Sequence, residues 1–227
     1  MGVRAGLKLA PTIMDILDYK EQITKIYLVR HGETRANKLR LLFGHLDLDL
    51  NQNGIKQARK TAKKLVRVGL APTHIISSPL KRAKHTAKII AKHLVGAGLT
   101  RTQKIIIDKD LLEKSEGTWE GKTFWEVRKE DSKNYKKWIK NPIKNRPPKG
   151  ESISDLNKRA KKFYKTILRK YLGENIIVVS HSGPIRLFIL NILGADINKF
   201  WHLQPDCGSI TEVHVSKKHS MICGFNL

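Results

Sequence analysis

Four side chains that can bind or attack phosphate groups follow apolar stretches of this sequence. Arg30, His31 and His181 come at the ends of two such stretches, and Arg82 follows a third through the segment SSPLK. A guanidinium matches phosphate oxygens with paired hydrogen bonds, and a neutral imidazole can attack phosphorus in line. If the apolar stretches are parallel strands, their carboxyl ends meet at one edge of a sheet, where α/β proteins bind ligands. The four side chains would then converge on one anion-binding pocket.

Each of these signals is weak when it is taken alone. A single histidine after a strand more often makes a structural hydrogen bond than it catalyses. A single arginine near the start of a helix is more often a surface residue. Glu113, in the segment LLEKSEGTWEG, would by itself be an ordinary loop carboxylate. The interpretation therefore depends on whether the fold brings these residues together.

The elements that would position them are predicted from short apolar runs that alternate with amphipathic stretches, a pattern typical of α/β folds. Four runs predict buried strands, and two later runs predict an antiparallel pair. The expected strands are Lys25–Val29, Thr73–Ser77, Ile105–Asp108, Ile176–Ser180, Ile210–Val215 and Ser220–Phe225. No internal repeat and no low-complexity linker divides the sequence.

Four helices are expected between these strands. Three amphipathic stretches, each with a glycine after it, run over 55–66, 83–94 and 153–171, and the glycines are Gly69, Gly96 and Gly173. Ser152 and Asp155 predict a capping box at the start of the third helix. Pro184 suits the first turn of a fourth helix.

The composition fits one generous domain with a strongly cationic surface. The 227 residues are 40% hydrophobic, which is enough for a sizeable core, and no apolar run approaches the ~20 residues of a membrane span. The formal net charge is +24. It would attract nucleic acid, acidic membranes or phosphorylated metabolites, and a solvated lysine-rich surface explains it equally well. Cys207 and Cys223 are too few for a disulfide framework, so we expect reduced thiols and a cytoplasmic protein without a signal peptide.

The motifs RHGETRAN, SSPLKRAKHTA, LLEKSEGTWEG, GES and VVSHSGPIR resemble those of the histidine phosphatase superfamily, also called phosphoglycerate mutase-like. They stand in the family's order, from about residue 25 to near the end of the sequence. The resemblance implies a three-layer α/β/α sandwich with a mostly parallel central sheet, an antiparallel edge and a small helical cap. Residues 1–24 would be an N-terminal extension, and 25–227 a single domain with a cap excursion at about 114–150.

The resemblance also implies a role for each matching residue. His31 corresponds to the nucleophile that becomes phosphorylated, and Glu113 to the proton donor. The residues expected to bind the substrate are Arg30, Asn37, Phe43, Gly44, Arg82, His181 and Ser182. Of these, Phe43 and Gly44 align more loosely, and Ser182 stands where the family usually has glycine. That serine would alter a backbone contact or narrow the pocket.

Fixed cations would do the work that a metal does in other phosphatases. The sequence has no HExxH, paired-aspartate or clustered Cys/His pattern of the kind that holds a metal. We therefore expect no cofactor and no metal. The favoured interpretation is a phosphomonoesterase that acts on a small phosphorylated metabolite, with no specific nucleic acid or membrane partner. A homodimer stays open.

Two alternatives also stay open. Phosphoglycerate mutases carry a longer, arginine-bearing insertion after the proton donor, whereas about 36 residues separate Glu113 from Gly150 here. That length resembles the alpha-ribazole phosphatases and broad-specificity phosphatases, with the aromatic residues of the segment packing the cap. The second alternative is a basic nucleic-acid-binding protein on a degenerate phosphatase fold, with the lysine-rich stretches 133–149 and 158–170 supplying the charge.

Overall fold

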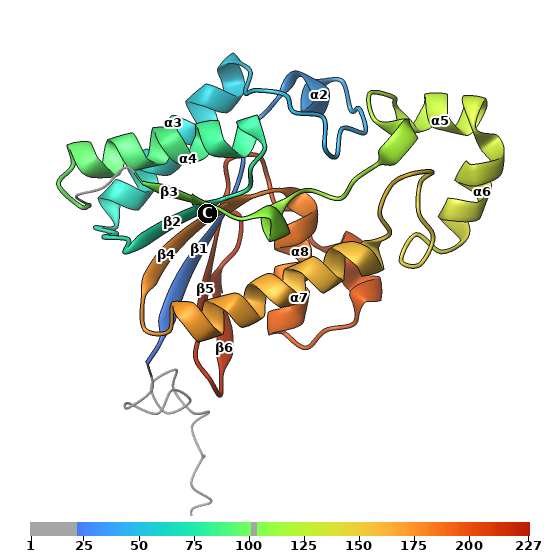
Figure 1. Ribbon diagram of the computed structural model, residues 1–227. Helices are drawn as coiled ribbons and strands as arrows, with labels where there is room; N and C mark the ends of the chain where they lie inside the picture. The colour runs from blue at the N-terminus through green and yellow to red at the C-terminus, as the bar shows by residue number, and fades with distance from the viewer. Residues whose placement is uncertain (1–21, 101–103) are drawn as a thin grey trace, which may run out of the picture.

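A six-stranded sheet with the strand order β3-β2-β4-β1-β5-β6 forms the centre of the computed structural model, which describes residues 22–100 and 104–227 (Figure 1). The strands are β1 (Thr24–Arg30), β2 (His74–Ser77), β3 (Ile105–Ile107), β4 (Asn175–Ser180), β5 (Ile210–Val215) and β6 (Ser220–Gly224). The first four in this order pair in parallel, whereas β5 runs antiparallel to both β1 and β6. The predicted mostly parallel sheet with an antiparallel edge is confirmed.

Two pairs of helices cover the two faces of this sheet (Figure 1). They are α3 (Gln52–Arg67) and α4 (Lys81–Gly96) on one face, and α7 (Ile153–Lys170) and α8 (Ser182–Ile192) on the other. Successive residues of a strand point to opposite faces, so Val29 packs with Leu65, and its neighbour Leu28 packs with Phe163. The unbroken apolar runs of β1 and β4 therefore fill both cores, as the three-layer α/β/α architecture requires.

The register of the parallel strands sets the position of the site. Arg30 at the end of β1 pairs with Ser180 at the end of β4, and Ser77 at the end of β2 pairs with Val179. Beyond these pairs, the N–H of His31 donates to the carbonyl oxygen of Ser180 at 3.0 Å. The chain segments that leave the three strands consequently begin at one edge of the sheet.

The helix ends agree with the sequence in part. The Ser152–Asp155 capping box is present, with the Ser152 Oγ accepting from the N–H of Asp155 at 3.1 Å. The second helix differs from the prediction, because Gly96 is still helical and Gly98 takes the left-handed conformation with φ of +70°. Glycine adopts that conformation without a Cβ penalty. The helix therefore ends later than predicted, and the left-handed residue that follows it is Gly98 instead of Gly96.

The segment predicted as a cap excursion contains short elements that periodicity did not predict. They are η2 (Gly117–Trp119), α5 (Phe124–Glu130) and α6 (Ser132–Lys140), and η1 (Lys109–Leu111) precedes them. Figure 1 shows α5 and α6 beside the sheet rather than over either face. Trp119 and Trp138 are buried in a small core of their own with Leu42 and Val127. They pack this segment as expected, whereas the side chain of Trp125 is 70% exposed.

Two further short helices lie outside the predicted set. They are α2 (Arg35–Lys38), after β1, and η3 (Ile197–His202), after α8. Most of the predicted N-terminal extension lies outside the described residues, and β1 begins one residue earlier than expected, at Thr24. Within 22–100 and 104–227, no helix is both long and apolar enough to cross a membrane.

Candidate active site

His31 lies at the carboxyl end of β1 with its side chain buried. Its exposed fraction is 1%, and its Nδ1 lies 2.7 Å from the carbonyl oxygen of Gly32. A carbonyl oxygen can only accept, so Nδ1 carries the hydrogen and the lone pair of the neutral ring is on Nε2. Burial lowers the pKa of His31 well below its ordinary value, and the charges of Arg82 and Arg30 lower it further. The ring is therefore neutral at neutral pH, and the lone pair of Nε2 is available to accept a proton or to attack an electrophile.

His181 follows β4 and lies beside His31, with 5.0 Å between the two ring centroids. The Nε of Arg82 donates to Nδ1 of His181 at 3.2 Å. Because a guanidinium can only donate, the hydrogen of His181 is on Nε2, which donates to the Oγ of Ser78 at 2.7 Å. Burial and the charge of Arg82 lower the pKa of His181 well below its ordinary value. His181 is thus a neutral hydrogen-bond donor.

Arg82, in the first turn of α4, is buried among backbone carbonyl groups. Its Nη1 donates to the oxygen of Leu46 and its Nη2 to the oxygen of Gly44, both at 2.7 Å. Together with the bond to His181, these contacts within the described chain take three of the five guanidinium N–H groups and leave two for an anion. Burial lowers the pKa of Arg82 to about 10, so the side chain stays charged at neutral pH.

Arg30 is held by the loop that precedes β5. Its Nη1 donates to the carbonyl oxygen of Pro205 at 2.7 Å, and its own carbonyl oxygen accepts from the N–H of Gly208 at 3.0 Å. Its Nε is buried without a hydrogen-bond partner in the part of the chain that the structure describes. A buried donor in this condition is costly, so an anion that accepts from Arg30 would be bound favourably.

The loop from Phe43 to Leu46 lies against these groups. The ring of Phe43 is edge-on to His31 with 6.4 Å between centroids, and the guanidinium of Arg82 lies 4.8 Å from the Phe43 centroid. A Cβ added to Gly44 would lie 2.6 Å from the carboxylate of Glu120. Position 44 therefore has to be glycine for the loop to lie this close to Glu120.

Asn37 belongs to α2, six residues after His31. Its Oδ1 accepts from the backbone N–H of Thr34 at 3.0 Å, as part of a capping box. This bond turns the amide oxygen of Asn37 toward the start of α2. The NH₂ group of Asn37 is then the end that can serve a ligand.

Glu113 enters the site from the segment that follows η1. Its Oε1 accepts from the N–H of Lys114 at 2.8 Å, and its Oε2 accepts from the N–H of Gly183 at 3.2 Å. A Cβ added to Gly183 would collide with Oε1 of Glu113. Ser182, which the sequence singled out, is the first residue of α8. The residue whose small size admits Glu113 is therefore Gly183 rather than the position before it.

The predicted residues thus come from separate segments, and the fold gathers two arginines, two histidines and a carboxylate at one sheet edge. Residues 26–227 match the family described as Histidine phosphatase superfamily (branch 1). The chain belongs to this superfamily. That match covers more than half of the sequence, and it includes every residue of the candidate site described above.

Phosphatases are also among the individual proteins that this chain resembles. Phosphoserine phosphatase 1 of Hydrogenobacter thermophilus is 31% identical over 205 residues, which are 90% of this chain and 93% of that protein. The alpha-ribazole phosphatase of Shigella flexneri superposes with a TM-score of 0.81 at 29% identity, covering 89% of this chain and 96% of that one. A phosphoserine phosphatase mutant of Entamoeba histolytica in complex with phosphoserine gives a TM-score of 0.75 at 30% identity, with the same coverage. This histidine phosphatase is accordingly an enzyme.

Sequence reasoning missed several residues that hold the site of this histidine phosphatase together. Ser78 bonds His181, and the Oγ1 of Thr86 accepts from the N–H of Gly32 at 3.1 Å. The motif SSPLKRAKHTA contained both side chains, but hydroxyl groups at strand and helix ends are common enough that spacing alone did not distinguish them. Ser78 thus orients the ring of His181, and Thr86 holds the backbone next to His31.

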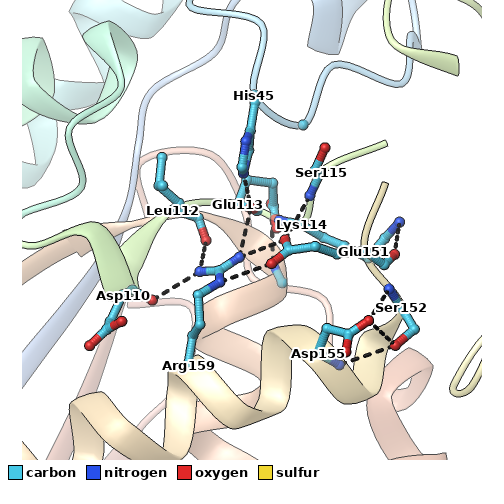
Figure 2. A network of polar contacts seen from close by, with 12 residues as sticks. His45, Asp110, Leu112, Glu113, Lys114, Ser115, Glu151, Ser152, Asp155 and Arg159 are labelled. Carbon is cyan, nitrogen blue, oxygen red and sulfur yellow. Dashed lines mark hydrogen bonds and ion pairs between the residues drawn. The ribbon is translucent and has the colours of Figure 1, made fainter. Parts of the chain in front are cut away.

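A second missed group surrounds the backbone of Glu113 (Figure 2). Arg159 of α7 reaches the carbonyl oxygen of Glu113 with its Nη2 at 3.1 Å and the carboxylate of Glu151 at 2.7 Å. From the opposite side, His45 donates through Nε2 to the same carbonyl oxygen at 2.9 Å. The GES motif contained Glu151, yet only the fold shows that its partner is on the next helix.

Metal-type ligands cluster elsewhere in this enzyme. Among the described residues, Glu212, His214 and Cys223 of β5 and β6 bring one ligand atom each to within 4.8 Å of one another. The charged neighbours of His31 are instead the guanidinium groups of Arg30 and Arg82, which favour an anion and oppose a cation. Cys223 and Cys207 are free thiols, as the sequence indicated.

Proposed function

We propose that this chain is a phosphomonoesterase that hydrolyses a small phosphorylated metabolite through a phosphohistidine on His31. The observation that carries this proposal is the hydrogen bond from Nδ1 of His31 to the carbonyl oxygen of Gly32 at 2.7 Å. It leaves the lone pair on Nε2, and the lowered pKa of the ring keeps that lone pair unprotonated at neutral pH. A neutral imidazole with a fixed tautomer is prepared to attack phosphorus.

The surrounding donors suit the charge that spreads over the phosphoryl oxygens during transfer. Arg30 has a buried Nε without a partner among the described residues, and Arg82 has two N–H groups to spare. His181 contributes the N–H that now bonds Ser78. Because Arg82 donates to it, His181 acts as a neutral donor, and the positive charge comes from the arginines. Removing one such preorganised donor costs roughly 3–4 kcal/mol in comparable sites.

Glu113 supplies and recovers the proton in this proposal. As Nε2 of His31 forms its bond to phosphorus, the ester P–O bond breaks and the leaving oxygen takes the proton of the Glu113 acid. Water then attacks the phosphohistidine, the N–P bond breaks, and the Glu113 carboxylate accepts the proton from that water. Each cycle releases one alcohol and one phosphate and returns both residues to their starting state.

The relatives support the class of substrate. Those compared above are named as phosphatases of phosphoserine and of alpha-ribazole phosphate, both of which are small phosphorylated molecules. We assign the same class to this enzyme, with water as the acceptor. A panel of phosphomonoesters that includes phosphoserine, alpha-ribazole phosphate and 3-phosphoglycerate would rank them by the rate of phosphate release.

Rapid-quench labelling tests the covalent step. We expect an acid-labile, base-stable phosphoenzyme that accumulates within one turnover and is absent in His31→Ala. His85→Ala is the matched control, because His85 is a partly exposed histidine of α4 that pairs with Asp49 at 2.7 Å. Undiminished labelling in His31→Ala, or loss of labelling in both variants, would show that His31 is not the nucleophile.

A further inference from the structure

Arg159 makes an unusually complete set of hydrogen bonds around the segment that carries Glu113 (Figure 2). Its Nη1 donates to the carbonyl oxygens of Asp110 and Leu112 at 3.1 and 2.9 Å. Its Nη2 donates to the carbonyl oxygen of Glu113 and, like its Nε, to the carboxylate of Glu151. These five bonds equal the donor capacity of a guanidinium. Arg159 is therefore fully committed to this one loop and this one carboxylate.

Glu151 continues the contact on the far side of Glu113. Its Oε2, which Arg159 contacts at 2.7 Å, also accepts from the backbone N–H of Ser115 at 3.0 Å. Burial raises the pKa of Glu151, but the bonds from Arg159 and Ser115 outweigh it and leave the pKa below its ordinary value. The carboxylate is thus charged at neutral pH. Glu151 thereby links Arg159 to the backbone of Ser115, two residues after Glu113.

Together the two side chains fix the backbone on both sides of Glu113. Carbonyl groups at residues 110, 112 and 113 and the N–H at 115 are all held from α7 and its N-terminal neighbour Glu151. With the backbone fixed, the carboxyl group of Glu113 is oriented by the N–H groups of Lys114 and Gly183. The position of the acid relative to His181 then depends on how α7 docks on η1.

We propose that Arg159 and Glu151 form a positioning clamp that sets the distance from the carboxyl group of Glu113 to the leaving oxygen. This inference rests on the proposed role of Glu113 as the proton donor. Neither clamp residue touches the reacting atoms, so both are positioning residues. A displacement of about 1 Å in a reacting group can cost roughly 10²-fold in rate. Lysine keeps the charge at position 159 but lacks the planar fork that reaches four acceptor groups at once.

The test distinguishes a misplaced Glu113 carboxyl group from a general loss of activity. Burst-phase rates of Arg159→Lys are measured with β-glycerol phosphate, whose alkoxide needs a proton, and with p-nitrophenyl phosphate, whose phenolate leaves without one. We expect a loss of roughly tenfold to hundredfold with the alkyl ester. The loss with p-nitrophenyl phosphate should stay within a few-fold. Glu151→Gln, which keeps the shape of the side chain, should show a smaller loss with the same selectivity.

Lys162→Met is the matched control. Lys162 lies one turn further along α7, its side chain is 73% exposed, and it pairs with the carboxylate of Asp110 at 2.9 Å rather than with the backbone of the loop. This variant should leave both burst rates unchanged. Equal losses for the two substrates in Arg159→Lys and Glu151→Gln, or no loss in either variant, would overturn the clamp.

Glu113→Gln is measured in the same assays as Arg159→Lys and Glu151→Gln. It distinguishes failure of the clamp from failure of the proposed acid role of Glu113. If Glu113 is the acid, its substitution is selective for the alkyl ester, and adding Arg159→Lys to it lowers the alkyl rate no further. Selectivity in Glu113→Gln without selectivity in Arg159→Lys would overturn the clamp alone. Absence of selectivity in Glu113→Gln itself would overturn the acid role and the clamp together.

Discussion

The two imidazoles at the carboxyl end of the sheet are held in opposite tautomers by their neighbours. Gly32 fixes the hydrogen of His31 on Nδ1, whereas Arg82 fixes the hydrogen of His181 on Nε2. One ring therefore presents a lone pair to the site and the other presents an N–H. Two chemically identical side chains gain different roles because a single backbone carbonyl and a single guanidinium differ in what they can donate.

Gly183 offers the sharpest test at the scale of one residue. Gly183→Ala should lower the burst rate with β-glycerol phosphate roughly tenfold or more, because the new Cβ collides with Glu113 and would displace it. Ser182→Gly, one position earlier, should change the same rate by no more than about twofold, the usual effect of a substitution away from a tight contact. A larger effect at 182 than at 183 would show that the family's glycine position matters more than the contact with Glu113.

Much of the site could be predicted from the sequence, because its chemistry stands in uninterrupted motifs. Arg30, His31, Arg82 and His181 each stand at or beyond the carboxyl end of a strand that its own apolar run identifies. Arg159 could not be found in this way, since it lies on a lysine-rich helix and differs from its neighbours only in what it touches. Its contacts join α7 to the segment 110–113 and to Glu151, and no local pattern encodes such a meeting.

At the scale of elements, α7 connects the edge of the sheet that carries the candidate site to one of the two cores of the sheet. It begins at the Ser152 cap, places Arg159 against the Glu113 segment, and buries Phe163 and Ile167 against the sheet. The first turn of α7 fixes where the helix begins, and this determines which way Arg159 and the later side chains of the helix point. A well-defined first turn is therefore a condition for an accurate site.

Ser152→Ala should lower the free energy of unfolding by about 1 kcal/mol, the usual value of an N-cap side chain. It removes the Oγ that donates to Asp155 and accepts from the same residue's N–H. In a protein of this size the melting temperature should fall by about 2–4 °C. Ser154→Ala, in the same turn, serves as the control, and its change should stay within about 0.5 kcal/mol. Urea unfolding measures both, and equal changes would mean that the capping box contributes nothing specific.

The elements themselves differ in how well the sequence predicts them. All six strands agree with prediction to within one residue at each end, because β-branched runs between polar segments mark them clearly. The small helical cap that the resemblance implied contains α5 and α6, but neither these two helices nor α2 was predicted from the residues themselves. They owe their stability to capping boxes, as at Thr123, and to burial of single aromatic residues such as Trp138, rather than to periodicity.

At the scale of the whole molecule, two buried neutral histidines make stability depend on pH. In the folded state the pKa of His31 and that of His181 lie well below 6.5, whereas in the unfolded chain both return to about 6.5. The unfolded state therefore binds more protons as the pH falls below 6.5, so acid favours unfolding. Each histidine should remove up to ~1.4 kcal/mol per pH unit in that range.

Urea unfolding at several values between pH 7.5 and 5 measures this slope in the wild type and in His31→Gln. The variant should lose about half of the histidine contribution to the slope, because one of the two buried imidazoles is gone. The stability of both proteins should level off above about pH 7.5, where the histidines of the unfolded state have lost most of their protons. An identical slope in the variant would mean that His31 titrates in the folded protein as it does in the unfolded chain.

The strand order also decides when the molecule can form during its synthesis. Among the strands of the described residues, β1 is made first, yet its two partners in the sheet are β4 and β5. From the end of β1 at residue 30 to the start of β4 at residue 175, 145 further residues must leave the ribosome. At the usual ~5–20 residues per second this takes roughly 7–30 seconds. Throughout that interval the apolar segment IYLV has neither of its partner strands, and unpaired strands of this kind expose a nascent chain to aggregation.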